Sequence, residues 1–373
     1  MKPVVLIPGI GGCALVNKNQ ASKTVFGKPI LDNRWVNFGI ISTPQYHKRW
    51  KDDMQKIQYI TDPLKQRIIG MQTDEAMDVY DFGGTNGVKN LLPELDTLPP
   101  MYNHKLDEIF THTYFGSLCD YLGTKGYIDA ETLFGAPYDF RTILDPSVRL
   151  LYFAKLMRLI EQNHEPAVIV SHSFGGLLFK WFLGTMEPSW IKEHIHHSIN
   201  VSVPYGGSLP ALMCMMQGSH YIPFLRGMVK QELNKVSGII SCFPNTGTDP
   251  VIEFKDGKEL YVQEYTELEN QRRIPSLKVY NDLFSHGLTI IKKQVSVPST
   301  FVYNNTTLTA SFYNTSKDIY FRSRGDGVVT IDSLQHFKDM YDTSIVNEIQ
   351  VLYGNHTSVL LSKELRDVVD KYI

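Results

Sequence analysis

Residues 168–178 read Val-Ile-Val-Ser-His-Ser-Phe-Gly-Gly-Leu-Leu, and the other parts of the chain can be placed relative to them. The short apolar, β-branched run over residues 167–170 predicts a central parallel strand that is covered on both faces. Two glycines follow Phe174, and an apolar pattern of helical period runs over residues 177–183. These features predict a strand, a very sharp turn and a helix, with Ser173 at the apex of the turn.

The turn around Ser173 needs small residues two places before and two places after the serine, as in the pattern Gly-x-Ser-x-Gly. Ser171 and Gly175 occupy these places, so one small residue replaces the first glycine. The stretch resembles the nucleophile elbow of α/β-hydrolases, where the N-terminus of the following helix favours an oxyanion. Two other interpretations are an N-cap serine in a plain loop and a membrane span over residues 167–186, against which Lys180 and the paired glycines argue.

The composition excludes some classes of protein. The chain has 373 residues, 43% of them hydrophobic, which allows one large domain with insertions or two domains. Its net charge of −2 makes a nucleic-acid partner unexpected. Four scattered cysteines have no metal-ligand spacing, and their low density suits a chain that does not depend on disulfides.

The expected location is intracellular, because no signal peptide is evident. Pro8 and Gly9 interrupt the first apolar run too early for a signal peptide, although a leader could have been removed from a secreted or lysosomal precursor. The glycosylation sequons are then expected to be coincidental; they start at Asn200, Asn304, Asn305, Asn314 and Asn355.

The alternation of strands and helices along the chain predicts a mostly parallel, doubly wound sheet. Strands are expected at residues 4–7, 132–134, 167–170, 198–203, 301–303, 319–321 and 346–353. Helices are expected at residues 113–121, 148–162, 177–183, 209–216 and 358–372. The glycine-rich turn over residues 8–12 is either a tight connection or half of an oxyanion hole, in which the backbone N–H groups of Ile10 and Phe174 would be the donors.

Two segments depart from this alternation and are expected to be insertions in one α/β-hydrolase domain over residues 1–373. Residues 30–80 place Trp35, Phe38 and Trp50 near basic residues, which suits contact with a membrane surface and equally suits an ordinary subdomain. Residues 208–295 lack clean strand–helix periodicity and are expected to form a cap or lid over the site.

Two more residues complete a candidate catalytic triad with Ser173. Asp326 lies in a glycine-flanked turn, and His356 follows the last expected strand. The order Ser–Asp–His is that of α/β-hydrolases. A serine needs a neutral imidazole to take its proton and a carboxylate to orient that imidazole. Taken singly, such an Asp is most often a turn residue and such a His is most often structural.

Several motifs together resemble the lecithin–cholesterol acyltransferase and lysosomal phospholipase family. They are the opening residues 5–9 (Val-Leu-Ile-Pro-Gly), residues 135–141 (Gly-Ala-Pro-Tyr-Asp-Phe-Arg), the elbow, residues 204–208 (Pro-Tyr-Gly-Gly-Ser), residues 325–327 and His356. Within the second motif, Asp139 and Arg141 could be taken for catalytic groups, but a structural ion pair or a role in ordering the loop is preferred. The sequence departs from the family at Ser171, at Phe140 where Trp is frequent, and in lacking a cysteine pair for an early lid loop.

The resemblance implies cleavage of a glycerophospholipid ester through an acyl-serine, with transfer of the acyl group to water or to a lipid alcohol at a membrane surface. It implies no metal and no cofactor. A soluble esterase or thioesterase on the same triad is the alternative within enzymes. The alternative that is not an enzyme is an inactive lipid-binding protein that keeps the elbow without its catalytic activity.

Overall fold

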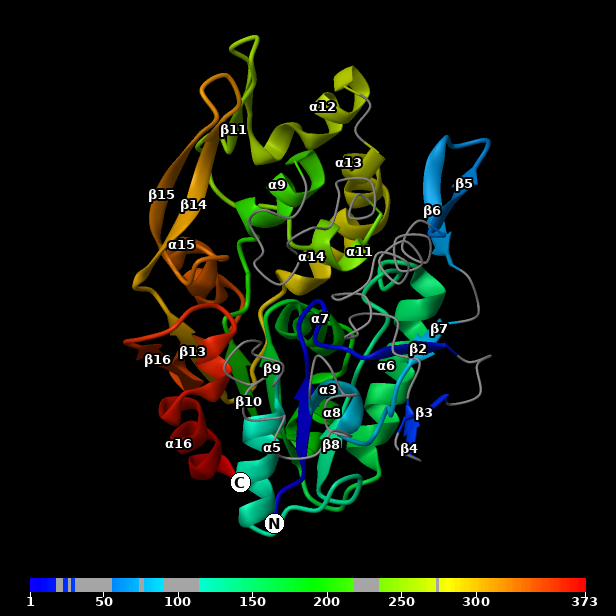
Figure 1. The fold of residues 1–373 in the computed structure, drawn as a ribbon, viewed down its shortest axis with the longest axis vertical. Coiled ribbons are helices and arrows are strands. Elements are labelled where there is room, and N and C mark those ends of the chain that lie inside the picture. The colour runs from blue at the N-terminus through cyan, green and yellow to red at the C-terminus, as the bar shows by residue number, and fades with distance from the viewer. Residues whose placement is uncertain are drawn as a thin grey trace.

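The computed structural model describes residues 1–17, 23–25, 28–30, 56–73, 77–89, 114–217, 235–272 and 275–373. Its centre is a six-stranded sheet in the order β16-β13-β10-β9-β1-β8, in which every neighbouring pair is parallel (Figure 1). The strands are β1 Val4–Ile7, β8 Leu133–Gly135, β9 Ala167–His172, β10 Ile195–Val201, β13 Ser299–Asn304 and β16 Val346–Val351. The predicted parallel sheet is confirmed.

The strand order changes direction beside β1. From β1 the chain runs to β8 at one edge, returns to β9 on the other side of β1, and then moves outward through β10, β13 and β16. In open parallel sheets, ligands bind beyond the carboxyl ends of the strands at such a reversal. A ligand site is therefore expected at the loops that follow β1 and β9.

Helices cover both faces of the sheet, and the strands alternate between two buried clusters. In β1, Val4 and Leu6 pack into one cluster, whereas Val5 and Ile7 pack into the other. The first cluster includes residues of α5 Gly116–Thr124 and α16 Lys363–Tyr372. The second includes residues of α6 Pro146–Glu161, α7 Phe174–Leu183 and α8 Pro188–His194. Burial on both faces explains the continuous apolar runs of the central strands.

Two predicted elements differ in the structure. The strand expected at residues 319–321 exists as β15 Ile319–Gly325, but it pairs antiparallel with β14 Thr307–Asn314 in a second sheet, ordered β12-β11-β14-β15. The helix expected at residues 358–372 is divided into a 3₁₀ turn, Ser358–Leu361, and α16. The break occurs because Ser362 is extended and its side chain caps α16 by accepting a hydrogen bond from Leu365 N at 3.1 Å.

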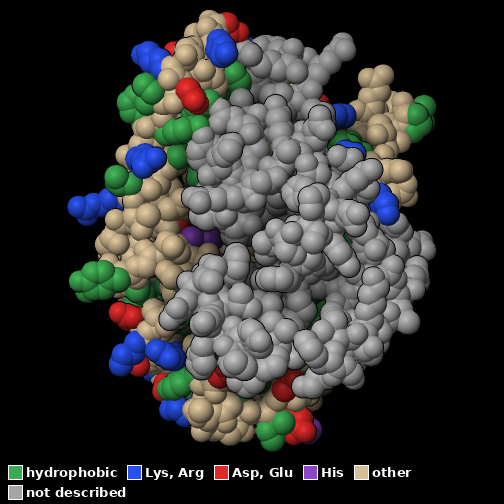
Figure 2. All heavy atoms as spheres, viewed as in Figure 1, with side chains coloured by type: hydrophobic (Ala, Val, Ile, Leu, Met, Phe, Trp, Pro, Cys, Tyr) green, Lys and Arg blue, Asp and Glu red, His purple; other side chains and the backbone are tan. Residues whose placement is uncertain are grey.

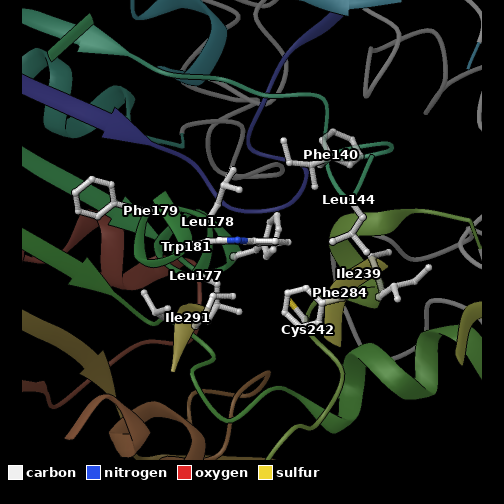
Figure 3. Packing of buried hydrophobic residues seen from close by; sticks show 14 of the residues in the cluster. Phe140, Leu144, Leu177, Leu178, Phe179, Trp181, Ile239, Cys242, Phe284 and Ile291 are labelled. Carbon is white, nitrogen blue, oxygen red and sulfur yellow. The ribbon is translucent and has the colours of Figure 1, made fainter. Parts of the chain in front are cut away.

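Residues 208–295 contribute short elements at the end of the molecule where the carboxyl ends of the central strands lie (Figure 1). In the described part of this range they are α9 Leu209–Gln217, α11 Ser237–Ile240, β11 Ile252–Glu253, β12 Glu259–Leu260, the 3₁₀ turn Val262–Glu264, α12 Tyr265–Arg272, α13 Pro275–Val279, the π-helical turn Tyr280–Phe284 and α14 Ser285–Ile291. Trp181 of α7 packs against Phe284 with ring centroids 5.8 Å apart, within a continuous apolar cluster (Figure 3). One core thus joins these elements to the sheet.

Only part of residues 30–80 is described, and Trp35, Phe38 and Trp50 lie outside the described residues. Strands described in this half of the chain are β2 Leu15–Asn17, β3 Lys23–Val25, β4 Lys28–Ile30, β5 Gln58–Asp62, β6 Arg67–Gln72 and β7 Met77–Val79. Two carboxylates hold the β5–β6 hairpin: Asp145 accepts from Met71 N and Asp282 accepts from Ile68 N, each at 2.7 Å. Among the helices described, none is long and apolar enough to span a bilayer.

Candidate active site

The turn between β9 and α7 has the strained geometry that the sequence predicts. Ser173 has φ 54° and ψ −131°, a region that residues other than glycine rarely adopt. A Cβ on Gly175 would lie 2.3 Å from the carbonyl oxygen of Pro8, so the loop after β1 leaves no room for a side chain there. Ser171, which stands in place of the usual first glycine, is buried and donates to Asn200 Oδ1 of β10 at 3.2 Å.

The three predicted triad residues meet in the structure. His356 Nε2 lies 2.9 Å from Ser173 Oγ, and His356 Nδ1 lies 2.7 Å from Asp326 Oδ2. A neutral imidazole that donates from Nδ1 to the carboxylate leaves Nε2 free to accept the serine proton. Asp326 is fully buried and His356 nearly so, whereas Ser173 is partly exposed. The arrangement can therefore generate a nucleophile that a substrate can reach.

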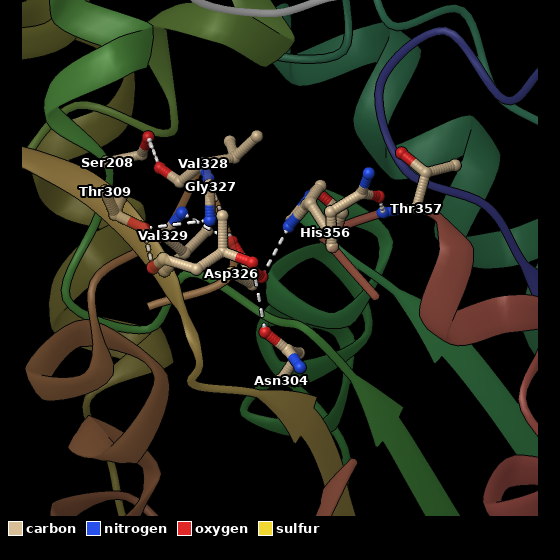
Figure 4. A network of polar contacts seen from close by, with 12 residues as sticks. Ser208, Asn304, Thr309, Asp326, Gly327, Val328, Val329, His356 and Thr357 are labelled. Carbon is tan, nitrogen blue, oxygen red and sulfur yellow. Dashed lines mark hydrogen bonds and ion pairs between the residues drawn. The ribbon is translucent and has the colours of Figure 1, made fainter. Parts of the chain in front are cut away.

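The turn that carries Asp326 supplies hydrogen-bond donors to its carboxylate. Asp326 Oδ1 accepts from Val328 N at 3.0 Å and from Val329 N at 2.7 Å, while Oδ2 faces His356 (Figure 4). The N–H of His356 donates to the carbonyl of Asp326 at 2.8 Å, which joins the two loops. These bonds offset the cost of burying a charged carboxylate.

Of the two predicted oxyanion donors, Phe174 directly follows Ser173, and Ile10 lies in a loop that passes beside it. Phe174 is the first residue of α7, so its N–H has no acceptor within the helix. The loop that carries Ile10 passes close to the serine, since a Cβ on Gly9 would lie 2.7 Å from Ser173 Cβ. Among the described residues, none accepts a hydrogen bond from the N–H of Ile10 or of Phe174. Both donors are thus available to a ligand.

His172, the neighbour of Ser173 in sequence, points away from the serine hydroxyl. Its Nδ1 contacts the hydroxyl of Tyr114, and its Nε2 lies 2.8 Å from the carbonyl oxygen of His356. Burial, and then the nearby His356, lower the pKa of His172 well below its usual value. Both ring nitrogens are engaged in these contacts, so His172 is not placed to take the proton of Ser173.

Residues 135–141 and 204–208 make structural contacts near the site. Asp139 and Arg141 form the expected ion pair, with Nη2 2.6 Å from Oδ2 and the guanidinium fully buried. In the second motif, Ser208 donates from Oγ to the carbonyl of Val328 at 2.6 Å and from its backbone N to the carbonyl of Cys242 at 2.7 Å. Residues 204–208 therefore tie the turn that carries Asp326 to the described part of residues 208–295.

All four cysteines are buried thiols, in agreement with the expectation that the chain does not depend on disulfides. Burial raises the pKa of Cys119 to about 12. A thiol with so high a pKa is a poor nucleophile at neutral pH. Burial thus argues against Cys119 as a nucleophile.

A nucleophile elbow at the reversal point of a parallel sheet, with Ser, Asp and His in that chain order, defines an α/β-hydrolase. The family model described as lecithin:cholesterol acyltransferase matches residues 103–371. The chain belongs to this family, which confirms the resemblance seen in the sequence motifs.

Three relatives illustrate the similarity. Lecithin-cholesterol acyltransferase-like 1 of Arabidopsis thaliana is 24% identical over 96% of this chain and 86% of its own length. Phosphatidylcholine-sterol acyltransferase of Homo sapiens is 30% identical over 63% of this chain and 51% of its own length. Lysosomal phospholipase A and acyltransferase of Canis lupus familiaris is 27% identical over 62% and 54%, respectively. The matches span most of the plant relative and about half of the two mammalian ones.

Proposed function

We propose that this protein is a serine-dependent lipid acyl hydrolase or transacylase that cleaves glycerophospholipid esters. Ser173 is the nucleophile, His356 the general base and Asp326 the residue that orients the imidazole. The observation that carries the proposal is the unbroken hydrogen-bonded series from Asp326 through His356 to Ser173, at 2.7 and 2.9 Å. Membership of the lecithin:cholesterol acyltransferase family supports lipid esters as substrates.

The geometry supports a two-step acyl transfer. Ser173 Oγ attacks the ester carbonyl while His356 Nε2 takes its proton, and the N–H groups of Phe174 and Ile10 bind the resulting oxyanion. His356 then gives the proton to the leaving lysophospholipid oxygen, which leaves an acyl group on Ser173. Water or a lipid alcohol, deprotonated in turn by His356, attacks this ester and restores the free serine.

The class of acyl donor is inferred from the relatives. The human relative is named for phosphatidylcholine and sterol, and the dog relative for phospholipase A and acyltransferase activity. A phospholipid donor, with water or a lipid alcohol as acceptor, is consistent with both names. Residues 208–295 are proposed as the cap over this site, because residues 204–208 fasten them to the catalytic turns.

We place the protein at a membrane surface as a peripheral enzyme. The β5–β6 hairpin supports this placement, because Leu64 at its tip is 94% exposed and lies beside the exposed Lys65 and Arg67. Figure 2 shows hydrophobic and basic side chains together at the position of this hairpin. Apolar residues flanked by basic ones bind the headgroup region of a bilayer. Residues 30–80 are therefore proposed as a membrane-binding insertion, with Trp35, Phe38 and Trp50 as further contacts.

The compartment is proposed to be intracellular, with a lysosomal or secreted location if a leader was removed. The dog relative is lysosomal by name. Three of the sequon asparagines, Asn200, Asn304 and Asn314, are buried, so the folded chain could not carry glycans on them. Their burial supports the expectation that these sequons are coincidental.

The test is incubation of the purified protein with phosphatidylcholine vesicles, with and without a lipid alcohol, followed by measurement of fatty acid, lysolipid and acylated alcohol. Ser173→Ala is expected to abolish all products, whereas Ser147→Ala, at an exposed serine of α6, should retain them. Full activity in Ser173→Ala would refute the proposal. Equal rates on dispersed and vesicular esters would indicate a soluble esterase, and vesicle binding without phosphonate labelling would indicate an inactive lipid-binding protein.

A further inference from the structure

Two buried tyrosine hydroxyls hold one peptide unit in the loop after β1. Tyr138 donates from its hydroxyl to the carbonyl oxygen of Pro8 at 2.8 Å, and the N–H of Gly9 donates to the hydroxyl of Tyr114 at 2.9 Å. The carbonyl of Pro8 and the N–H of Gly9 belong to the same planar peptide and point in opposite directions. The two tyrosines therefore hold this peptide from opposite sides.

The held peptide immediately precedes the amide of Ile10, the second proposed oxyanion donor. Gly9 must lack a side chain, because a Cβ there would lie 2.7 Å from Ser173 Cβ and 2.9 Å from the Tyr114 hydroxyl. Glycine also has the widest conformational freedom, so it cannot by itself fix the direction of the next N–H. The hydrogen bonds from the hydroxyls of Tyr114 and Tyr138 supply the rigidity that Gly9 lacks.

Tyr114 also joins this loop to the catalytic histidine. Its hydroxyl accepts from Gly9 and so has its proton available for Nδ1 of His172. With Nδ1 as acceptor, neutral His172 carries its proton on Nε2, which donates to the carbonyl of His356. Burial raises the pKa of Tyr114 and of Tyr138, so both hydroxyls stay protonated. A single series of contacts thus runs from the loop after β1, which carries Ile10 and is called the oxyanion loop below, to the backbone of His356.

We propose that Tyr114 and Tyr138 are positioning residues for the transition state, which aim the N–H of Ile10 at the oxyanion by clamping the Pro8–Gly9 peptide. The inference rests on the proposed function of Ser173. Neither tyrosine touches the reacting atoms, so each acts only through the loop. Their removal should therefore weaken oxyanion binding while leaving binding of the ground-state ester nearly unchanged.

The experiment compares Tyr114→Phe and Tyr138→Phe with a matched control, a tyrosine that bonds the backbone just before β1. Tyr127 donates its hydroxyl to the carbonyl of Lys2 at 2.8 Å, so Tyr127→Phe removes the same type of bond at the opposite end of β1. Hydrolysis of a short-chain p-nitrophenyl ester gives kcat and KM. Inhibition by an alkyl trifluoromethyl ketone, which forms a tetrahedral oxyanion on the serine, reports on the oxyanion hole. Tm reports on the folded state.

The clamp variants are expected to lower kcat by about 10–100-fold with little change in KM, which is less than the loss of a whole oxyanion donor. The ketone should bind more weakly by the same factor. The double variant should cost about as much as the worse single variant, because both hydroxyls hold one peptide. Tyr127→Phe should change Tm alone.

The proposal is overturned if Tyr138→Phe behaves as Tyr127→Phe does, or if kcat falls without a matching loss of ketone affinity. Should Tyr114→Phe fail to fold, Tyr138→Phe carries the comparison by itself. Ser173→Ala separates the two levels of inference. If Ser173→Ala turns over the ester as fast as wild type does, the proposed function is wrong, and the clamp is wrong with it. The same follows if wild-type protein neither turns over the ester nor binds the ketone. Serine-dependent turnover with unaffected clamp variants removes only the clamp.

Discussion

A glycine in place of Ser173 should give a more stable protein than an alanine there. Ser173 has φ 54° and ψ −131°, and a residue with a Cβ held in such a region typically costs about 1–3 kcal/mol. Glycine adopts these angles freely but gives up about 0.5–1 kcal/mol through the greater entropy of its unfolded chain. Both variants lose the hydrogen bond to His356, so that loss cancels between them. Ser173→Gly should therefore be more stable than Ser173→Ala by about 1 kcal/mol.

The assay is reversible unfolding in urea, followed by tryptophan fluorescence and by circular dichroism, with equal m-values as the condition for comparison. Ser147 provides the control, because it is an exposed residue in the first turn of α6. There the order should reverse, with glycine less stable than alanine by roughly 0.5–1 kcal/mol. If Ser173→Ala equals or exceeds Ser173→Gly in stability, the turn stores no strain and the reasoning is wrong.

Three further predictions concern neighbouring features. Gly175→Ala places a Cβ 2.3 Å from the Pro8 carbonyl and should displace the oxyanion loop, which would lower kcat/KM in ester hydrolysis by about 100-fold; an unchanged value would contradict this. Asp326→Asn should lower kcat by about 10³–10⁴-fold with Tm nearly retained, because the imidazole loses its orienting carboxylate. Burial lowers the pKa of Lys180 to about 7 from 10.5, so between these values the unfolded chain binds one more proton than the folded chain. The unfolding free energy of wild type should then rise with pH in that window by up to about 1.4 kcal/mol per unit relative to Lys180→Met, and parallel urea profiles would disprove it.

The central strands and the triad could be predicted because each has a local signal. A fully buried parallel strand is a continuous apolar run, and an elbow needs small residues at fixed positions around the serine. His356 follows β16 of the central parallel sheet, as the fold predicts, whereas Asp326 follows β15 of the second sheet. The chain order Ser–Asp–His and the glycine-flanked turn pointed to Asp326, and the two hydrogen bonds of 2.7 and 2.9 Å join it to His356 and His356 to Ser173.

The clamp on the Pro8–Gly9 peptide had no such signal. Tyr114 contacts Gly9 across 105 residues of sequence, and Tyr138 contacts Pro8 across 130. Tyr138 lies in the recognised motif of residues 135–141, but nothing near either tyrosine in the sequence indicates a contact with the loop after β1, because only the packing of separate elements brings the hydroxyls to that loop. The sheet membership of β15 was missed for the same reason, since it depends on pairing with β14 and not on local pattern.

The order of Ser173 and His356 along the chain has a consequence for the protein while it is being synthesised. Ser173 is made 183 residues before His356, and the strand that delivers His356 is β16, at the edge of the sheet. Until β16 has been synthesised and has paired with β13, the serine has no base and remains an ordinary alcohol. On the proposed mechanism, a nascent chain therefore cannot form an acyl-serine until this last strand has joined the sheet.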